Sequence, residues 1–189
     1  GKAIALEIAN GYWFQAIGDK LIVLTKDGGS KVTTVMLAQD PASASCRDLL
    51  YSGDRMFALL DDGDVVVLDI SNATQPRIIQ RHKAASLGIL PLDLVLVNSW
   101  PVVIGNGGCV RLSDGSRLVR CEGTVTGIAM SIDRGIVYVK DRRIFDGDTD
   151  EFLGSATELF ALDDDANAKI GTIVYSRDLA GETEIGLMT

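Results

Sequence analysis

The sequence predicts an all-β fold made of a repeated unit, and three observations carry this prediction. The apolar runs are short and rich in β-branched residues, as in strands, and no long run shows the 3.6-residue period of a helix. Turn signals separate these runs about every 8 to 12 residues, and the strands recur with a regular spacing. The clearest runs are 21–24, 56–60, 65–70 and 135–139, and residues 43–50 could form one short turn of helix.

The turn signals pair Asp or Asn with Gly. These residues tolerate the positive φ that tight hairpins require. Hairpin turns are therefore expected at Asp27-Gly28-Gly29, Asp62-Gly63, Asn106-Gly107-Gly108, Asp114-Gly115 and Asp146-Gly147.

Five similar units follow one another along the chain. Their starts differ by 35, 45, 34 and 36 residues. A period of this length holds four short strands joined by tight turns, which is the size of one propeller blade. The sequence therefore predicts a β-propeller of about five short four-stranded blades, or a partial set of blades from a larger propeller. The units start at Asp19, Asp54, Ser99, Asp133 and Lys169.

The blades are expected to form one domain over residues 1–189. The last unit runs out after three strands, whereas residues 2–8 form an additional strand without a unit of its own. Propellers often close by letting one terminus complete the blade at the other end, which removes a free sheet edge. In a closed ring, residues 2–8 would complete the last blade. The expected blades are 10–45, 46–85, 86–123, 124–157 and 158–189.

Two units resemble known propeller repeats. The segment 64–72, followed by Pro76-Arg77-Ile78-Ile79, resembles the LVIVD repeat, in which a strand ending in Asp-Val-Ser-Asn precedes a Pro-containing turn and an outer strand. The segments 136–139 and 144–150 are similar to YVTN-type blades, with their Ile-Asp-Gly-x-Thr turn. The resemblance implies an extracellular, periplasmic or cell-surface scaffold that binds a protein or a small ligand through the loops at one end of the ring.

Charge and hydropathy exclude two classes of partner. The chain has 26 acidic and 18 basic residues and a net charge of -8, so it repels phosphate backbones and nucleic acid is not expected as a partner. No apolar run approaches the roughly 18 residues of a membrane helix, and residues 1–10 lack the plan of a signal peptide. We expect no membrane insertion, and either a monomer or a part of a larger chain.

No group of acid, base and nucleophile stands out, so no catalytic or cofactor-binding residue is assigned. His82 is the only histidine, and its place at the end of an outer strand favours a solvated role. The innermost strands are expected at 13–17, 87–90 and 127–130, where the residues are mostly apolar and small. This pattern favours a packed, inert channel and leans against an enzyme.

Asp146, Asp148 and Asp150 alternate with Gly147 and Thr149, and three carboxylates with this spacing could bind Ca²⁺ as in an EF-hand loop. The glycine and glutamate expected later in that loop are missing. A hairpin turn explains the same residues without a metal, so both interpretations stay open.

Cys109 and Cys121 flank a hairpin centred on Asp114-Gly115, which places them opposite or one step apart across the ladder. A disulfide is possible there if the register is right, and it would indicate an oxidising compartment. The third cysteine, Cys46, would have no disulfide partner. All three cysteines could also be free, buried thiols.

Three functions remain open at this stage. The first is a non-enzymatic scaffold with a binding face on its loops. The second is a propeller domain or subunit of a secreted hydrolase or dehydrogenase, with its site on the channel face. The third is a structural segment of a larger surface protein. The fold alone does not decide among them.

Overall fold

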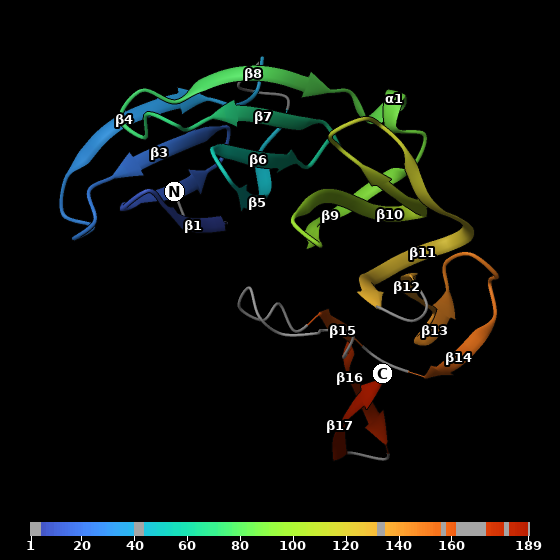
Figure 1. The fold of residues 1–189 in the computed structure, drawn as a ribbon. Coiled ribbons are helices and arrows are strands. Elements are labelled where there is room, and N and C mark those ends of the chain that lie inside the picture. Colours follow the sequence, from blue (N-terminus) through green and yellow to red (C-terminus); the bar gives the residue numbers. More distant parts are fainter. Residues whose placement is uncertain are drawn as a thin grey trace. The chain divides into compact units, whose positions relative to one another are not determined.

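The computed structural model describes residues 5–39, 44–131, 135–155, 158–161, 173–179 and 182–188. Within these residues there are 17 strands and one four-residue helix, so the expected all-β class is confirmed. The chain divides into two compact units, Gly1–Leu94 and Val95–Thr189, and each is described by itself (Figure 1). Among the described residues, no helix has the length and apolar character needed to cross a membrane.

The first sheet is a four-stranded antiparallel meander in the order β1-β2-β3-β4. Its central strands bury alternate residues, because successive side chains of a strand point to opposite faces. Phe14 and Leu21 are fully buried in this way. The strands are β1 (Ala5–Ala9), β2 (Tyr12–Ile17), β3 (Lys20–Leu24) and β4 (Lys31–Met36).

The first strand belongs to this sheet and not to the last one. β1 pairs with β2 from Ala5↔Ala16 to Ala9↔Tyr12, and it is the edge strand of the first sheet. The sequence had suggested that residues 2–8 complete the last blade; of these, residues 2–4 lie outside the described residues. A short hairpin through Asn10 and Gly11 makes the local pairing, which closes a much smaller loop than pairing with the C-terminal end would.

The second sheet has the order β5-β6-β7-β8 and contains the LVIVD-like segment. Its two central strands are buried on both faces, so they read as continuous apolar runs. Residues 46–50 lie in β5, so the short helical turn expected at 43–50 was wrong there: pairing with β6 extends this segment. The strands are β5 (Cys46–Ser52), β6 (Arg55–Leu60), β7 (Val65–Asp69) and β8 (Arg77–His82).

These two sheets share one core within the first unit. Phe14 and Val23 of the first sheet belong to the same buried cluster as Met56 and Leu68 of the second. The edge strands β1 and β5 lie beside each other, which is the place where two propeller blades converge. β1 and β5 are therefore the inner strands of their blades.

A six-stranded sheet follows, in the order β9-β10-β11-β12-β13-β14. Its long strands serve more than one blade: β11 pairs with β10 through its first half and with β12 from Val125 onward (Figure 1). The strands are β9 (Leu90–Val97), β10 (Trp100–Arg111), β11 (Arg117–Ser131), β12 (Gly135–Lys140), β13 (Arg143–Asp146) and β14 (Phe152–Ser155), and the helix α1 (Ala84–Leu87) precedes them.

β10 reverses its direction at the expected Asn106-Gly107-Gly108 turn. Leu112 N donates a hydrogen bond to Pro101 O at 2.9 Å. In one continuous extended strand these two residues would lie too far apart for this bond. Gly108 has a φ of +126°, and a Cβ on it would lie 2.1 Å from Val119 O. Only glycine fits this close approach of two strands.

The last described sheet is three-stranded, in the order β15-β16-β17. The start of the fifth sequence unit, Lys169, lies outside the described residues. The strands are β15 (Glu158–Ala161), β16 (Ile173–Leu179) and β17 (Glu182–Met188).

Candidate functional site

Two adjoining hollows lie on the second sheet, where the β5–β6 and β7–β8 turns meet. Their volumes are about 550 and 220 Å³, and Asp69 and Ser71 form the wall between them. We call the two hollows together the loop-face site. The larger hollow is lined by Ser52, Gly53, Asp54, Arg55, Asp69, Ser71 and Ile79, and the smaller by Asp69, Ser71, Asn72, Gln75 and Arg77.

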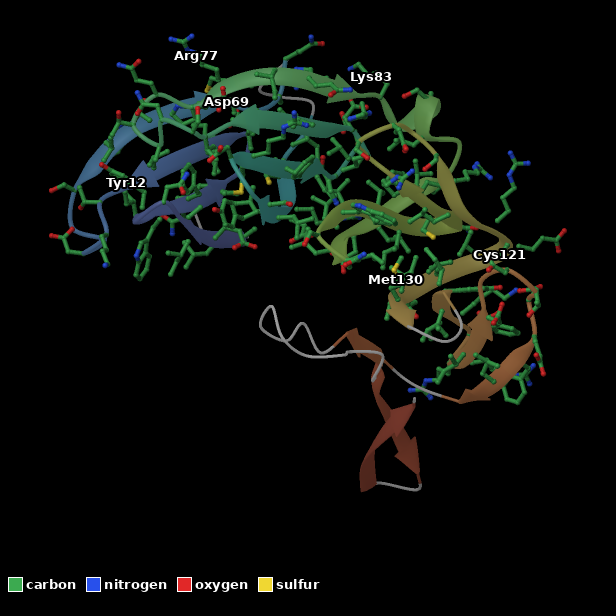
Figure 2. The ribbon with its side chains drawn as sticks, viewed as in Figure 1. Tyr12, Asp69, Arg77, Lys83, Cys121 and Met130 are labelled. Carbon is green, nitrogen blue, oxygen red and sulfur yellow. The ribbon has the colours of Figure 1, made fainter. Side chains whose placement is uncertain are left out.

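Strand register places a carboxylate between two guanidinium groups in this site. Asp69 at the end of β7 is the Cα partner of Arg55 on β6 and of Arg77 on β8. Cross-strand partners share one face of a sheet, so the three side chains form a row. Asp69 and Arg77 lie close together where β7 ends and β8 begins (Figure 2).

The turn between β7 and β8 is held by its own hydrogen bonds. Ser71 N donates to Asp69 Oδ1 at 2.9 Å, and Thr74 N and Oγ1 donate to Asn72 Oδ1 at 3.2 and 2.8 Å. Asx turns of this kind let Asp and Asn side chains replace missing backbone acceptors. Gln75 N adds a 3.0 Å bond to Asn72 O. The polar lining is therefore positioned before any ligand arrives.

The turn is also anchored to the core beneath it. Ile70 is fully buried, and its N–H donates to Asp54 O at 2.8 Å. Asn10 Nδ2, from the first sheet, donates to Ile70 O at 3.0 Å. These bonds bring the β1–β2, β5–β6 and β7–β8 turns to the same end of the first unit.

The site combines carboxylates with guanidinium groups. The Ser71 hydroxyl and backbone N–H, followed by the charges of Arg77 and Arg55, hold the pKa of Asp69 below its usual range, so this carboxylate is ionised at neutral pH. Neither guanidinium forms a salt bridge or a hydrogen bond with any residue that the structure describes. Asp54 also lines the larger hollow, so the two hollows together contain two carboxylates and two guanidinium groups.

An exposed apolar side chain lies beside this row, at a β-bulge. Val67 pairs with Gln80 and Leu68 with Ile78, so Ile79 has no partner on β7. Bulges turn side chains away from the regular alternation of a strand. Ile79 is 51% exposed and lines the larger hollow together with Arg55.

Asp146, Asp148 and Asp150, the expected metal ligands, lie in the β13–β14 turn. Asp146 is 7% exposed, and its Oδ1 accepts hydrogen bonds from the N–H groups of Asp148 and Thr149 at 3.0 and 2.9 Å. Asp150 accepts a hydrogen bond from the Tyr138 hydroxyl. Among the described residues, no three His, Cys, Asp or Glu side chains are grouped so that they could hold a metal ion.

Cys109 and Cys121 are free thiols in the structure. Cys109 pairs in register with Val119, so Cys121 lies one step along the ladder on the same face. Burial raises the pKa of Cys109 to about 12 and also raises that of Cys121. Their joining on oxidation stays a prediction. Cys46 is a third free thiol, buried and with a pKa raised to about 12, as an unreactive core residue should be.

His82 lies at the end of β8 that is distant from the loop-face site. Its register partner is Val65, whereas Arg77 at the other end pairs with Asp69. Burial lowers the pKa of His82, and its Nε2 is buried without a hydrogen-bond partner in the described residues.

The inner strands differ from those expected. Residues 12–17 form the second strand of the first sheet, and residues 87–90 include the end of α1; the expected segment 127–130 does lie in the half of β11 that pairs with β12. β1 alternates half-buried and exposed residues up to the buried Ala9, whereas β5 is half-buried along most of its length. These inner strands carry Glu7 and Asp48.

Sequence reasoning missed a carboxyl pair formed by Asp48 on β5 and Asp93 on β9. Asp48 Oδ1 accepts from Leu49 N at 2.8 Å, and Leu94 N donates both to Asp48 Oδ2 at 3.2 Å and to Asp93 Oδ1 at 3.0 Å. Burial, followed by the hydrogen bond and repulsion from Asp93, raises the pKa of Asp48 to about 7. Arg47 donates to the backbone oxygens of Pro91 and Leu92, so the whole group fastens β5 to the start of β9.

Comparison with known proteins identifies the fold. No protein-family model and no curated protein matches the chain. Among solved structures, it is similar to BamB from Moraxella catarrhalis (TM-score 0.58, 16% identity, 97% of this chain and 57% of that chain). It is also similar to the computationally designed Ika8 protein (0.62, 17%, 100% and 59%) and to the WD40 β-propeller domain of Doa1 (0.58, 16%, 93% and 60%).

These similarities show a β-propeller fold, which confirms the fold class expected from the sequence. The chain spans between 57% and 60% of the length of these structures, and its sheets fit a partial set of propeller blades. At 16 to 17% identity the likeness concerns the fold alone.

Proposed function

We propose that this chain is a non-enzymatic β-propeller scaffold that binds a protein partner through its loop-face site. The observation that carries the proposal is the pair of exposed guanidinium groups without ion-pair partners, on either side of an ionised aspartate and beside the exposed Ile79. Arginine is enriched among the residues that dominate the binding energy of protein interfaces, and the centre of such interfaces is apolar.

Binding fits the site better than catalysis does. A lowered pKa makes Asp69 a weak base, and His82 lies five residues further along β8 than Arg77, or about 16 Å for an extended strand. The Ser71 hydroxyl contributes a hydrogen bond that lowers the pKa of Asp69, so its nearest carboxylate is a poor base to activate it.

The two alternatives receive less support. An enzyme with its site on the channel face would use Asp48 and Asp93, but backbone N–H groups already occupy oxygens of both. A purely structural segment would not need two exposed arginines and the exposed Ile79 around one hollow.

We further propose an extracellular, periplasmic or cell-surface location. It is supported by the resemblance of the second and fourth units to LVIVD and YVTN blades and by the closeness of Cys109 and Cys121 along the β10–β11 ladder. Cell fractionation tests this location, and recovery from the cytoplasmic fraction would contradict it.

The binding proposal is tested by selecting random phage-displayed peptides on the immobilised chain. We expect the recovered peptides to bind the wild type and to lose at least tenfold in affinity for a variant with both Arg55→Ala and Arg77→Ala. The matched control carries Arg120→Ala and Arg143→Ala, which remove the same charge from exposed positions on β11 and β13. Failure to recover peptides, or equal binding by the two double variants, would show that the loop-face site is not the binding surface.

A further inference from the structure

The turn between β7 and β8 contains a sequence motif that the binding proposal does not use. Asn72-Ala73-Thr74 has the form Asn-x-Thr with a residue other than proline in the middle, which is the acceptor sequence for N-linked glycosylation. No other asparagine of the chain is followed two residues later by serine or threonine. The chain therefore has a single position that fits this modification.

The structure places this motif where a modifying enzyme can reach it. Asn72 and Thr74 are exposed, whereas Ala73 between them is 5% exposed and belongs to the buried core of the first unit. An N-linked glycan is bulky and solvated, so only an exposed asparagine can carry it. Asn72 lines the smaller hollow, and the glycan would be attached outside the larger hollow that contains Arg55 and Ile79.

The hydrogen bonds of the turn leave the reacting atom of this asparagine free. Asn72 Oδ1 accepts hydrogen bonds from Thr74 N at 3.2 Å and from Thr74 Oγ1 at 2.8 Å. Because a backbone N–H can only donate, the end of the amide that faces it is the oxygen. Asn72 Nδ2 forms no hydrogen bond with any residue that the structure describes. The hydroxyl that the motif requires therefore contacts the amide group, while the amide nitrogen is available.

We propose that Asn72 is a site of N-linked glycosylation. The sugar donor is an oligosaccharide carried on a lipid diphosphate, and a transferase joins it to the chain. A bond forms between Asn72 Nδ2 and C1 of the first sugar, and the bond between C1 and the diphosphate oxygen breaks. The lipid diphosphate leaves with the electron pair of that bond, and Nδ2 gives one proton to a base of the transferase.

This proposal rests on the proposed extracellular or cell-surface location, because the glycan is added to chains that leave the cytoplasm. It does not depend on what the loop-face site binds. The Asn72 side chain is held by bonds within its own turn, and Ala73 anchors that turn in the core. The fold therefore accepts a glycan on Asn72 without rearrangement of the second sheet.

The proposal is tested by secreting the full chain from a eukaryotic cell line with a leader peptide added in front of it. The intact mass is measured before and after digestion with a peptide N-glycosidase. We expect the wild type to lose the mass of one glycan on digestion, and peptide mapping to assign that glycan to Asn72. The variant Asn72→Gln should be secreted without a glycan.

Two variants of Thr74 form a matched pair. Thr74→Val keeps the β-branched shape of the side chain but removes the hydroxyl, so we expect the glycan to be lost. Thr74→Ser keeps the hydroxyl and should still carry the glycan. Position 74 is exposed, so both variants should fold, and equal unfolding midpoints show that the turn is intact.

The outcomes separate this inference from the proposed function. Secretion of the wild type without a glycan, a glycan that persists in Asn72→Gln, or equal glycosylation of the two Thr74 variants overturns the inference. None of these results bears on phage selection, which uses unglycosylated chain from a bacterial host and decides the binding proposal by itself. Cell fractionation likewise decides the proposed location.

Discussion

Two aspartates occupy the same position in the second and fourth blades and have opposite surroundings. Asp69 ends β7 and Asp146 ends β13, each the third strand of its blade. Each accepts a hydrogen bond from the backbone N–H two residues later, Ser71 N at 2.9 Å and Asp148 N at 3.0 Å. The sequence matched these two turns to two different repeat families, but their local hydrogen bonding is the same.

The backbone around the two turns is also alike. The residue after each aspartate donates its N–H to the neighbouring strand: Ile70 N to Asp54 O at 2.8 Å, and Gly147 N to Ile136 O at 2.7 Å. In both cases the acceptor immediately precedes the Cα partner of the aspartate. The backbone at the start of the two turns is therefore arranged in the same way.

The neighbouring side chains differ. The Cα partner of Asp146 is the fully buried Val137, and the residue whose carbonyl accepts Asp146 N is Glu151. At the loop-face site, both cross-strand partners of Asp69 are exposed arginines. The comparison teaches that the start of the turn fixes the backbone conformation around the aspartate. The residues on the adjacent strands then determine whether its carboxylate stabilises the fold or faces a ligand.

The largest expected effect is the loss of stability on Asp146→Ala. Two N–H groups, of Asp148 and Thr149, would lose their acceptor beside a nearly buried position, which should lower the free energy of unfolding by about 1–3 kcal/mol. Asp69→Ala should cost less than about 1 kcal/mol, because solvent replaces its bonds. Urea unfolding followed by tryptophan fluorescence measures both losses. Asp146→Ala is made in a Trp13→Phe background, so that Trp100 reports unfolding, and Asp69→Ala in a Trp100→Phe background, so that Trp13 reports it.

Asp146→Asn is the control, since its amide oxygen can still accept both N–H groups and should recover most of the loss. Equal losses for Asp69→Ala and Asp146→Ala would contradict the division into a binding turn and a structural turn.

A smaller effect is expected for Gly147→Ala in the same turn. A Cβ at this position would lie 2.7 Å from Ile136 O and 3.0 Å from two Ile136 side-chain atoms, so the strands must shift, at a cost of about 1–2 kcal/mol. Gly154→Ala on β14 is the matched control, because its Cβ would meet nothing within 4 Å. Thermal unfolding of both variants checks this, and an equal midpoint for the two would show that the turn has room for a side chain.

The fold class was predictable because the central strands have a clear signature in the sequence. Residues 65–69 and 136–139 are buried on both faces or nearly so, and such strands give short continuous apolar runs. The inner strands were missed for the opposite reason: one face of β1 is exposed, at Leu6 and Ile8, so its pattern is weak. Aligning the sequence on its most apolar runs therefore assigned the inner role to the wrong strands in the first unit.

The candidate site was only partly visible in the sequence. Asp69, Ser71 and Asn72 could be assigned to a turn, because their short side chains bond locally to the backbone. Their alignment with Arg55 and Arg77 depends on the register of three strands, and a one-residue bulge leaves Ile79 without a partner on β7. Neither has a local signature, because register and bulges are set by packing across the whole sheet.

The smallest expected effect uses pH to separate the loop-face carboxylate from the one on the inner strand. Burial and the neighbouring Asp93 raise the pKa of Asp48 to about 7, whereas Ser71 and the two arginines lower the pKa of Asp69. The pKa of the Asp48 carboxyl group is higher in the folded than in the unfolded state. Below the unfolded-state pKa the group does not reduce the free energy of unfolding, and as the pH rises from there towards 7 it lowers that free energy progressively.

Acidification from about pH 8 to pH 6 should therefore raise the free energy of unfolding of the wild type, by about 1 kcal/mol or less because Asp48 is partly solvated. Asp48→Asn should flatten this dependence, as Trp13 fluorescence would report in urea titrations. Asp69 stays ionised over the same range, so the affinity of the phage-selected peptides for the loop-face site should not change. A peptide affinity that follows the same pH profile as the stability would mean that the two carboxylates are coupled, and that the loop-face site is not electrostatically independent of the inner strands.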